Sequence, residues 1–561
     1  MDTIKSCINL VTKNCYMASI DLKDAYYSIP IDGNFQKFLK FQWKGVLYKF
    51  TCLPMGLASA PRDFTKVLKP VFAHLRKIGH ISSPYLDDTF LKGNTYEQCE
   101  DNVQDTMHMF DSLGFTAHDD SKSVTIPTQQ IEHLGFIINS RDMTVGINDT
   151  KYQKLKSLAR QVTETDSCTI RTVSQLIGVM VAYCTGVEYG ELFCKQLEID
   201  KIAALRESRG NYEAQMCISQ QSRQDIAWWI SNANIRKKKI SHGVTKHSLK
   251  TDSSNIGWGA IRDNDMANGK WTDEEKSDHI NVLELKAVLN GLLSLCNDLH
   301  NKHIKLYIDN MTAVAYIRNM GGTHSIKCNE VARDIWEWAI SRNNWLLPCY
   351  IPGILNVEAD FASRVFDDTT EWMLHKKVFQ DITSVFGIPD IDLFASNMNH
   401  QLERYVSWSP DCKAVAVDAF SMFWGDEFIY CFSPFSILSE VMSKIQQEEA
   451  KALVIVPYWP TQTWFPQMTH MLINNPLLLP RMKRLLTLPF DPSKTHPLGS
   501  KMQMMACLLS GKDSCVQDFH RGLKKSSCLL GGKELKNSTK LTTKNGVHLQ
   551  VDGKLITCNH L

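Results

Sequence analysis

The chain has 561 residues, too many for one hydrophobic core, and this length predicts about three or four domains. Hydrophobic residues make up 43% and charged residues 22%, as in a folded globular protein, and the net charge of +2 neither supports nor excludes a nucleic-acid partner. No run of 18 apolar residues and no signal-peptide core is present, so we expect neither a membrane span nor secretion. The 17 cysteines are scattered without a CxxC pair, which favours reduced thiols in the cytosol or nucleus and no zinc site.

The first 145 residues alternate short apolar runs with amphipathic stretches, a pattern that predicts a mixed α/β domain. The predicted strands are Met17–Asp21, Ser28–Ile31 and Leu47–Cys52, followed by a hairpin over Pro84–Lys92 around Asp87-Asp88. The predicted helices are Gly56–Phe72 and Tyr96–Leu113, the second ended by Gly114.

Along the rest of the chain the composition and the hydrophobic periodicity change several times, and these changes predict the domain boundaries. Residues 146–240 read as mostly helical and end in a basic linker near 236–247, and strands and helices alternate again over 246–366. A further α/β stretch covers 375–490, and residues 491–561 are poor in aromatics and rich in Lys, Ser and Gly, which predicts a mobile tail. The predicted fold class is therefore α/β (α+β) with several domains.

Two adjacent acids, Asp87 and Asp88, lie in the predicted hairpin, and Asp21 lies at the end of an earlier strand. An adjacent acidic pair is usually a solvated turn, because acids are mostly exposed. If the strands are neighbours, however, Asp21 and Asp87 could share two hard cations, which would reduce the repulsion between the carboxylates. Two Mg²⁺ ions about 4 Å apart would stabilise the attacking and leaving oxygens of a phosphoryl transfer.

The surrounding sequence argues against an ordinary solvated turn at Asp87-Asp88. The order is Asp-x-x-x-Ala-Tyr from Asp21, Leu-Pro-x-Gly-Leu-x-x-Ala-Pro from Leu53, Tyr-Leu-Asp-Asp from Tyr85, Leu-Gly-Phe followed by Lys122, and His-Leu-Gly-Phe from His133. This series resembles motifs A to E of reverse transcriptases. The resemblance implies a reverse-transcriptase palm over residues 1–145, with Asp21, Asp87 and, less directly, Asp88 as metal ligands.

The same resemblance assigns further roles. Tyr26 would lie under the sugar of the incoming nucleotide, and Lys122 is a candidate acid for the leaving pyrophosphate, although an exposed lysine explains it equally well. The remaining substrate-binding candidates are Met55, Gly56, Tyr85 and Leu86. Only 20 residues precede Asp21, so the fingers region is expected to be largely absent, because the reading frame begins upstream or this copy is truncated.

A second set of acids follows residue 246. Asp252 ends one predicted strand and Asp309 another, whereas Glu284 and Asp360 lie on predicted helices. Each acid alone is most often a helix cap or a solvated residue. Their order of strand, helix, strand, helix, with the phrase Ile-Pro-Gly-x-x-Asn-x-x-Ala-Asp-x-x-Ser-Arg from Ile351, resembles the RNase H fold. The resemblance implies that the four acids bind two Mg²⁺ ions and hydrolyse the RNA strand of an RNA–DNA hybrid.

The order of these regions resembles the polyprotein of DIRS-type retrotransposons, whose C-terminal domain is similar to DNA adenine methyltransferases. Here the expected Asp/Asn-Pro-Pro-Tyr motif is replaced by Ser433-Pro434-Phe435, and no convincing glycine-rich cofactor loop is present. We therefore expect 375–490 to be a degenerate or structural domain. Residues 146–240 would be the thumb or connection. Trp228 and Trp229 in this region could stack on bases, but paired tryptophans on an apolar helix more often pack in the core.

The sequence thus predicts an RNA-directed DNA polymerase joined to a hybrid-specific ribonuclease, with two Mg²⁺ (or Mn²⁺) ions in each site. The expected partners are an RNA template, a DNA primer, deoxynucleoside triphosphates and an RNA–DNA hybrid, together with a recombinase from the same element. Two alternatives remain open. One is a non-catalytic nucleic-acid-binding remnant, and the other is an active ribonuclease beside an inert polymerase half.

Overall fold

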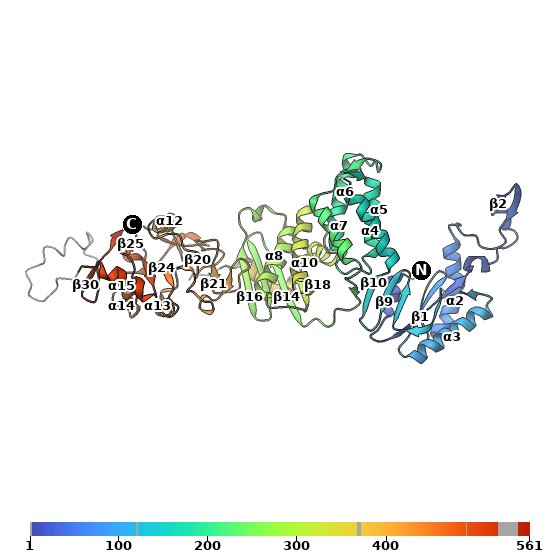
Figure 1. Cartoon of the computed structure of the whole chain (residues 1–561), viewed down its shortest axis with the longest axis horizontal. Coiled ribbons are helices and arrows are strands. Elements are labelled where there is room, and N and C mark those ends of the chain that lie inside the picture. The colour runs from blue at the N-terminus through green and yellow to red at the C-terminus, as the bar shows by residue number, and fades with distance from the viewer. Residues whose placement is uncertain (1–2, 119–121, 166, 367–371, 490, 525–547) are drawn as a thin grey trace, which may run out of the picture. The chain divides into compact units, whose positions relative to one another are not determined.

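The structure is a computed structural model that describes all residues except 1–2, 119–121, 166, 367–371, 490 and 525–547 (Figure 1). It divides into two compact units. Unit 1 contains residues 1–244 and 316–336, and unit 2 contains residues 245–315 and 337–561. Among the described helices, none is both long enough and apolar enough to cross a membrane.

Unit 1 begins with a sheet in the order β4-β5-β1-β6, with β7 (Val124–Thr128) also paired to β1. Its central strands are β1 (Tyr16–Lys23) and β5 (Asp88–Gly93), β4 is Ile81–Tyr85, and β6 is Thr116–Ala117. Helices α2 (Ala60–Lys77) and α3 (Tyr96–Ser112) pack against it, and α1 (Ile4–Leu10) precedes β1. The apolar stripe of α2, which includes Phe64, Leu68 and Phe72, is buried, as its helical spacing requires.

Two predictions in this region are wrong. The strand predicted over Ser28–Ile31 is not formed: Ser28 ends a short 3₁₀ helix (Ala25–Ser28), and Pro30 makes an isolated bridge to Cys52. Asp24 adopts a left-handed conformation (φ 50°) before this helix, and its carbonyl accepts the Ser28 N–H. The helix predicted from Gly56 starts at Ala60, since Gly56 has φ 90° and cannot be helical. The hairpin β2 (Lys40–Trp43) and β3 (Val46–Lys49) stands between these segments.

A second sheet of unit 1 has the order β13-β10-β9-β8, formed by β8 (Gln130–His133), β9 (Phe136–Asn139), β10 (Thr144–Ile147) and β13 (Lys238–Lys239). The basic segment predicted as a linker therefore contributes a strand. Between β10 and β13 the chain is helical, as predicted: α4 is Asp149–Thr163, α5 Ile170–Tyr183, α6 Lys195–Glu207 and α7 Gln220–Asn232. Trp229 is buried and Trp228 stacks on Phe193 with ring centroids 3.9 Å apart, so both tryptophans serve packing.

Unit 2 opens with a five-stranded sheet in the order β16-β15-β14-β17-β18. Its strands are β14 (His247–Ser253), β15 (Gly257–Arg262), β16 (Asp265–Lys270), β17 (His303–Ile308) and β18 (Trp345–Tyr350). β14, β17 and β18 run parallel, whereas β15 pairs antiparallel with both β14 and β16. Helices α8 (Ile280–Leu295) and α11 (Val357–Arg364) pack on this sheet, and each carries one predicted site acid.

The chain after residue 372 forms a six-stranded sheet in the order β20-β23-β24-β28-β25-β31. β20 (Ile391–Asp392), β23 (Phe428–Cys431) and β24 (Lys451–Pro457) are parallel, and β28 (Met504–Ser510) is antiparallel to β24. β25 is Leu477–Leu478 and β31 is Asn559–His560. Helices α12 (Lys376–Phe386) and α13 (Leu438–Gln447) contribute buried apolar residues to the core on either side.

The prediction of a mobile tail from residue 491 is wrong for the described part of that segment. Every residue of β28 is buried, and the strand pairs with both β24 and β25. Helix α15 (Asp513–Arg521) and the hairpin of β29 (His548–Val551) and β30 (Lys554–Thr557) follow it. The overall composition of the segment concealed the short apolar run that makes β28, and the rest of the prediction, over 525–547, falls outside the described residues.

Candidate functional site

The first predicted acidic cluster lies on the central strands of unit 1. Asp21 of β1 and Asp88 of β5 are direct cross-strand partners, and Asp87 lies in the turn that joins β4 to β5. The turn is tight because Leu86 takes a left-handed conformation (φ 57°), and the Leu22 N–H donates to the Asp87 carbonyl across 2.9 Å. Strand pairing therefore brings Asp21 beside an adjacent pair of acids that lies 66 and 67 residues later in the sequence.

The neighbouring charges explain the electrostatics of Asp21. Burial raises its pKa, and the negative charges of Asp87 and Asp88 raise it further. His118 and Lys122 oppose this rise: the His118 Nε2 lies 3.7 Å from Asp21 Oδ1, and Lys122 Nζ lies 3.3 Å from the same imidazole nitrogen. Lys122 is thus close to the acids, beside a histidine that the sequence analysis missed.

Asp88 contacts a second histidine, His133, which the sequence did not indicate as a site residue. The Nδ1 of the buried His133, on β8, lies 3.2 Å from Asp88 Oδ1. Burial alone lowers the pKa of His133, but the interactions with Asp88 and Cys7 outweigh it and raise the pKa to about 9. The raised pKa favours the charged imidazole beside Asp88.

Three of the predicted substrate-binding residues, Tyr26, Tyr85 and Leu86, lie at or near the same turn. Burial raises the pKa of the Tyr26 hydroxyl, as do the nearby charges of Asp87 and Tyr85, and the Tyr26 ring packs edge-on against Phe64. Tyr85 and Leu86 are half-buried beside the acids. Met55 is 63% exposed, and Gly56 has open space where a side chain would be, so this loop presents backbone to solvent.

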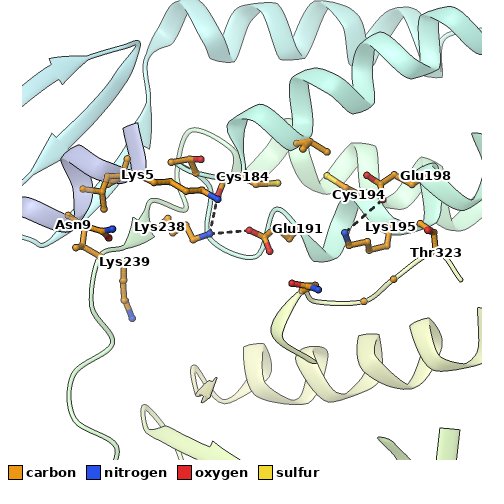
Figure 2. A pocket seen from close by; sticks show the side chains of 18 of the residues that line it. Lys5, Asn9, Cys184, Glu191, Cys194, Lys195, Glu198, Lys238, Lys239 and Thr323 are labelled. Atoms are coloured by element: carbon orange, nitrogen blue, oxygen red, sulfur yellow. Dashed lines mark hydrogen bonds and ion pairs between the residues drawn. The ribbon is translucent and has the colours of Figure 1, made fainter. Parts of the chain in front are cut away.

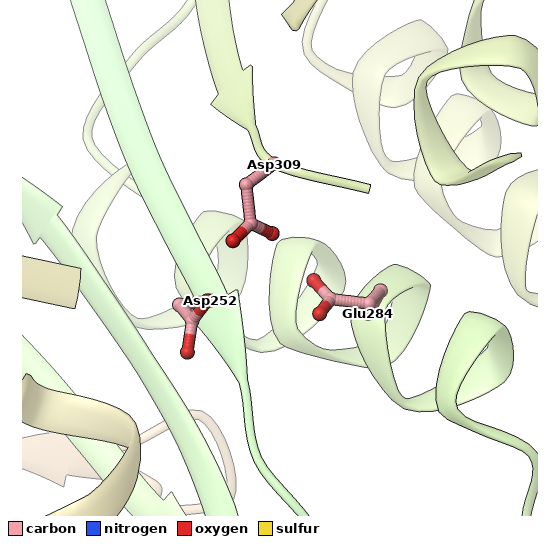
Figure 3. A group of neighbouring side chains, drawn as sticks. All are labelled: Asp252, Glu284 and Asp309. Carbon is pink, nitrogen blue, oxygen red and sulfur yellow. The ribbon is translucent and has the colours of Figure 1, made fainter. Parts of the chain in front are cut away.

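The second acidic cluster is in unit 2 and is more compact. Asp252 at the end of β14, Glu284 on α8 and Asp309 after β17 offer carboxylate oxygens that all lie within 4.8 Å of one another (Figure 3). Within the described residues, this is the one acidic or His/Cys group that meets this spacing. The parallel pairing of β14 with β17 places the two aspartates side by side, and α8 packs across β14 to bring Glu284 to them.

These three carboxylates are crowded and poorly solvated. Burial first, and then the charges of Asp309 and Asp252, raise the pKa of Glu284 to about 9. Burial likewise raises the pKa of Asp252 to about 6, and raises that of Asp309. The Oε2 of Glu284 is buried and has no hydrogen-bond partner. A divalent cation fits this donor set, because it would satisfy the orphaned oxygen and relieve the repulsion among three oxygen ligands.

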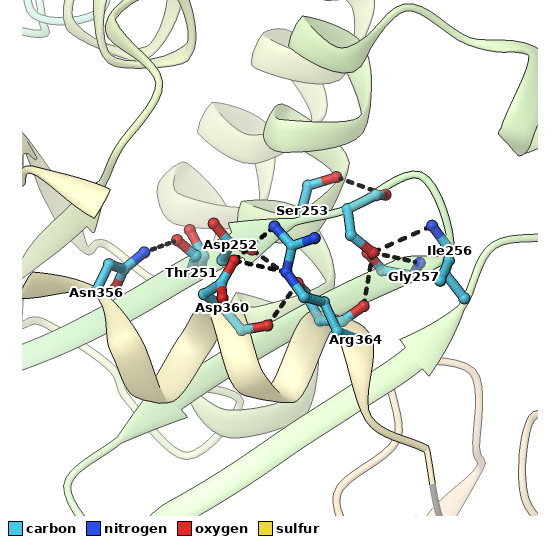
Figure 4. Close-up of polar contacts among 10 residues, drawn as sticks. Thr251, Asp252, Ser253, Ile256, Gly257, Asn356, Asp360 and Arg364 are labelled. Atoms are coloured by element: carbon cyan, nitrogen blue, oxygen red, sulfur yellow. Dashed lines mark hydrogen bonds and ion pairs between the residues drawn. The ribbon is translucent and has the colours of Figure 1, made fainter. Parts of the chain in front are cut away.

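The fourth predicted acid, Asp360 on α11, lies beside the cluster but outside the three-residue group. Its Oδ1 accepts from Nε of Arg364 across 2.7 Å, and Nη2 lies 2.6 Å away (Figure 4). The charge of Asp360 still raises the pKa of both Asp252 and Asp309, so it is electrostatically part of the site. The structure therefore brings Asp252, Glu284 and Asp309 together, whereas Asp360 forms an ion pair with Arg364.

Residues without an assigned role in the sequence analysis hold helix α11 in place. The hydroxyl of Ser363 lies 2.7 Å from Asp252 Oδ2, and the Asn356 amide donates to the Thr251 carbonyl across 2.9 Å. A side chain at Gly259 would lie 2.6 Å from the Ala362 Cβ and from the backbone of α11. The Ser-Arg pair at the end of the Ile-Pro-Gly phrase was the available sequence signal, whereas nothing local indicated Gly259.

Unit 1 also contains a cavity of about 670 Å³ lined by lysines. Lys5, Lys195, Lys238 and Lys239 line it, together with Glu191 and Glu198 (Figure 2). Lys238 Nζ contacts Glu191 at 3.3 Å and Lys195 Nζ contacts Glu198 at 3.8 Å. The lysines outnumber the acids by two, so the cavity favours anions.

The first acidic cluster lies in a segment that matches a known family. Residues 1–138 match the family model described as reverse transcriptase (RNA-dependent DNA polymerase). The chain contains a reverse transcriptase domain. Two viral relatives align with it: the Gag-Pol polyprotein of Gibbon ape leukemia virus is 27% identical over 128 residues, and the Gag-Pro-Pol polyprotein of Human T-cell leukemia virus 2 is 28% identical over 145 residues.

These alignments cover 21% and 24% of this chain, and 7% and 10% of the respective relatives, so the chain matches only a small part of each polyprotein. Among solved structures, foamy viral protease-reverse transcriptase in complex with double-stranded DNA is similar at a TM-score of 0.37 and 15% identity, covering 62% of this chain and 59% of the other. The same viral enzyme in complex with an RNA/DNA hybrid has a TM-score of 0.34 at 17% identity, covering 64% and 47%. The reverse transcriptase domain rests on the family match over residues 1–138.

Proposed function

We propose that the chain is an RNA-directed DNA polymerase joined to a ribonuclease H, encoded by a retroelement. The domain at residues 1–138 and its retroviral Pol relatives support the polymerase half. In this proposal Asp21 and Asp87 hold the divalent ions, with Asp88 beside them. Bound Mg²⁺ or Mn²⁺ would activate a primer 3′-OH and neutralise the triphosphate charge of the incoming deoxynucleotide.

The chain's own residues would position the substrates. Tyr26 lies beside Asp87 and would pack under the sugar of the nucleotide, and the exposed backbone at Met55-Gly56 would lie against base or template. Lys122, next to His118, is available to donate a proton to the leaving pyrophosphate. Gly135, in the left-handed turn between β8 and β9, would hold the primer end.

The ribonuclease proposal rests on one observation, the convergence of Asp252, Glu284 and Asp309 around a buried oxygen without a partner. The order of the elements supports it: the acids lie on a strand, on a helix, directly after a strand and on a helix, in the order expected of an RNase H fold. Divalent ions in this site would generate hydroxide and stabilise the leaving 3′ oxygen of the RNA strand. Asp360 would join the ligand set once substrate or metal competes with Arg364 for its carboxylate.

The remaining assignments complete the proposal. The helices of residues 146–240 would serve as thumb or connection, and the lysine-lined cavity beside them would contact the phosphate backbone of a template–primer duplex. The C-terminal sheet after residue 375 would be the methyltransferase-like domain of a DIRS-type element, with its catalytic motif replaced. A recombinase encoded by the same element would be a further partner.

The deciding experiment uses the full chain with Mg²⁺, a primed RNA template and a labelled RNA–DNA hybrid. We expect Asp87→Asn to abolish primer extension and leave hybrid cleavage intact, and Asp252→Asn to do the reverse. Hybrid cleavage without extension by the unaltered chain would favour an active ribonuclease beside an inert polymerase half. Binding without either activity would show a non-catalytic remnant, and the proposal would be wrong.

A further inference from the structure

Lys151, the third residue of helix α4, connects this helix to the turn between β8 and β9 in unit 1. Its Nζ donates to the Leu134 carbonyl across 2.9 Å. The same ammonium lies 3.5 Å from the centre of the Phe136 ring and 5.5 Å from that of Tyr183 on α5. Aromatic faces attract a cation at these distances, so the side chain is held against the turn.

The turn that the lysine contacts has a strained backbone. Leu134 has φ 51° and Gly135 has φ 74°, so both central residues of this two-residue hairpin loop are left-handed. Such loops favour Asn-Gly or Asp-Gly, because a leucine at the first position gains no local side-chain hydrogen bond in return for the steric cost. A strained conformation persists where its surroundings enforce it, and the bond from Lys151 to the Leu134 carbonyl is one such contact.

The space beside Gly135 is occupied by the same lysine. A Cβ at Gly135 would lie 2.7 Å from Cε of Lys151 and 3.1 Å from its Nζ. Even a methyl group at this position would therefore displace the ammonium from the turn. The glycine thus permits both the left-handed backbone and the close approach of Lys151.

The first residues of α4 make further bonds to β8 and the turn. The Asn148 N–H donates to the Gly135 carbonyl across 3.4 Å, and the Asn148 side-chain amide donates to Oε1 of Glu132 across 2.6 Å. The Asn148 Oδ1 accepts the backbone N–H of Lys151 across 2.9 Å, which caps the helix. Burial lowers the pKa of the Lys151 ammonium to about 8, and the charge of Glu132 opposes this fall, so the lysine is mostly protonated at pH 7.

The other side of the turn leads to the first acidic cluster. His133, which directly precedes Leu134, lies 3.2 Å from Asp88. We propose that Lys151 is a positioning residue of the polymerase site, which fixes the primer end relative to the acids by holding the Leu134-Gly135 turn against α4. The inference rests on the proposed polymerase function, in which Gly135 holds the primer end. Lys151 acts through the turn and contacts none of the acids proposed to bind metal.

The test compares Lys151→Met with the unaltered full chain in single-nucleotide extension of a primed template with Mg²⁺. Methionine retains the apolar stem but removes the donor and the charge. A misplaced primer 3′-OH should lower kcat about tenfold or more, whereas KM for the deoxynucleotide and Kd for the duplex should change less than about twofold. Lys154→Met, at an exposed position on the same helix, removes an equal charge and should leave kcat unchanged.

A second measurement needs no catalysis. A duplex with 2-aminopurine at the primer 3′ end, bound in EDTA, should emit differently on Lys151→Met than on the unaltered chain or Lys154→Met. In the free chain, the amides of residues 131–138 should exchange about tenfold faster in Lys151→Met, because the turn loses a charged hydrogen bond. Gly135→Ala should reproduce the altered emission, and adding Lys151→Met to it should change the emission little further.

The two measurements separate this inference from the proposed function. Emission that depends on Lys151 in a chain that extends no primer would contradict the polymerase proposal and support the positioning role. Faster exchange in Lys151→Met with unchanged kcat and unchanged emission would show that the lysine only stabilises the fold, and the inference would be overturned. An unaltered chain that binds no primed template would overturn both.

Discussion

The Ser363 hydroxyl lies 2.7 Å from Oδ2 of Asp252 and joins helix α11 to the end of strand β14. Both residues are buried. A donor at this position lowers the pKa of Asp252, which burial and neighbouring acids would otherwise raise further. Helix α11 therefore positions Asp360 and also helps to keep Asp252 ionised.

Ser363→Ala should reduce hybrid cleavage about tenfold at neutral pH and leave primer extension unchanged. Without the donor, the pKa of Asp252 rises above about 6, so the ascending limb of the pH–rate profile should move to higher pH. The profile separates this effect from general damage, because cleavage should recover as the pH rises. Ser384→Ala, an exposed serine on α12, is the control, and an unshifted profile in Ser363→Ala would contradict the role assigned here.

Glu284→Gln should stabilise the metal-free chain at alkaline pH and abolish its stabilisation by Mg²⁺. The pKa of Glu284 is raised from 4.5 to about 9, so between these values the folded state binds more protons than the unfolded state. The free energy of unfolding should consequently fall as the pH rises from about 4.5 to 9 in EDTA. The glutamine variant cannot ionise, and it should lose this contribution to the decline.

Thermal melting of both proteins across this pH range, with and without Mg²⁺, measures the difference. The unaltered chain should gain several degrees on adding Mg²⁺ at pH 8, because metal binding favours the ionised carboxylate. Glu198→Gln, in unit 1, controls for the loss of a carboxylate elsewhere. Equal pH dependence in Glu284→Gln and the unaltered chain would show that Glu284 ionises normally.

Gly259→Val should reduce hybrid cleavage more than 100-fold while primer extension persists. Even a Cβ at this position would lie 2.6 Å from Ala362 and from the α11 backbone, so the helix that carries Asp360 and Ser363 must move. Gly33→Val is the matched control, because a Cβ there meets nothing within 4 Å. Circular dichroism and melting should show that Gly259→Val remains folded, and full nuclease activity would show that close packing of α11 is dispensable.

Local sequence predicted the elements that carry acids better than the contacts between them. The hairpin at Asp87-Asp88 and the strand–helix order around Asp252 and Glu284 follow from periodicity, and the structure contains them. The His133–Asp88 contact joins residues 45 positions apart in two different sheets, and no local pattern encodes it. By contrast, the Asp360–Arg364 ion pair is an i,i+4 contact on α11 that the predicted helix allows, whereas the position of Asp360 outside the compact trio is a feature of the tertiary structure.

Lys5→Glu should weaken binding of a template–primer duplex several-fold and reduce the slope of log affinity against log salt by about one or two. Lys5 is exposed on α1 and lines the lysine-rich cavity of unit 1, so the substitution removes one cation from a site where lysines only slightly outnumber acids. Contacts to phosphate release counterions, and the loss of one contact lowers the slope by about 0.9, with the added repulsion contributing more. Lys377→Glu, exposed on α12 of unit 2, carries the same change in net charge and should leave affinity and slope unchanged. Fluorescence anisotropy between about 50 and 200 mM salt measures both quantities, and identical slopes in the two variants would exclude the cavity as a phosphate contact.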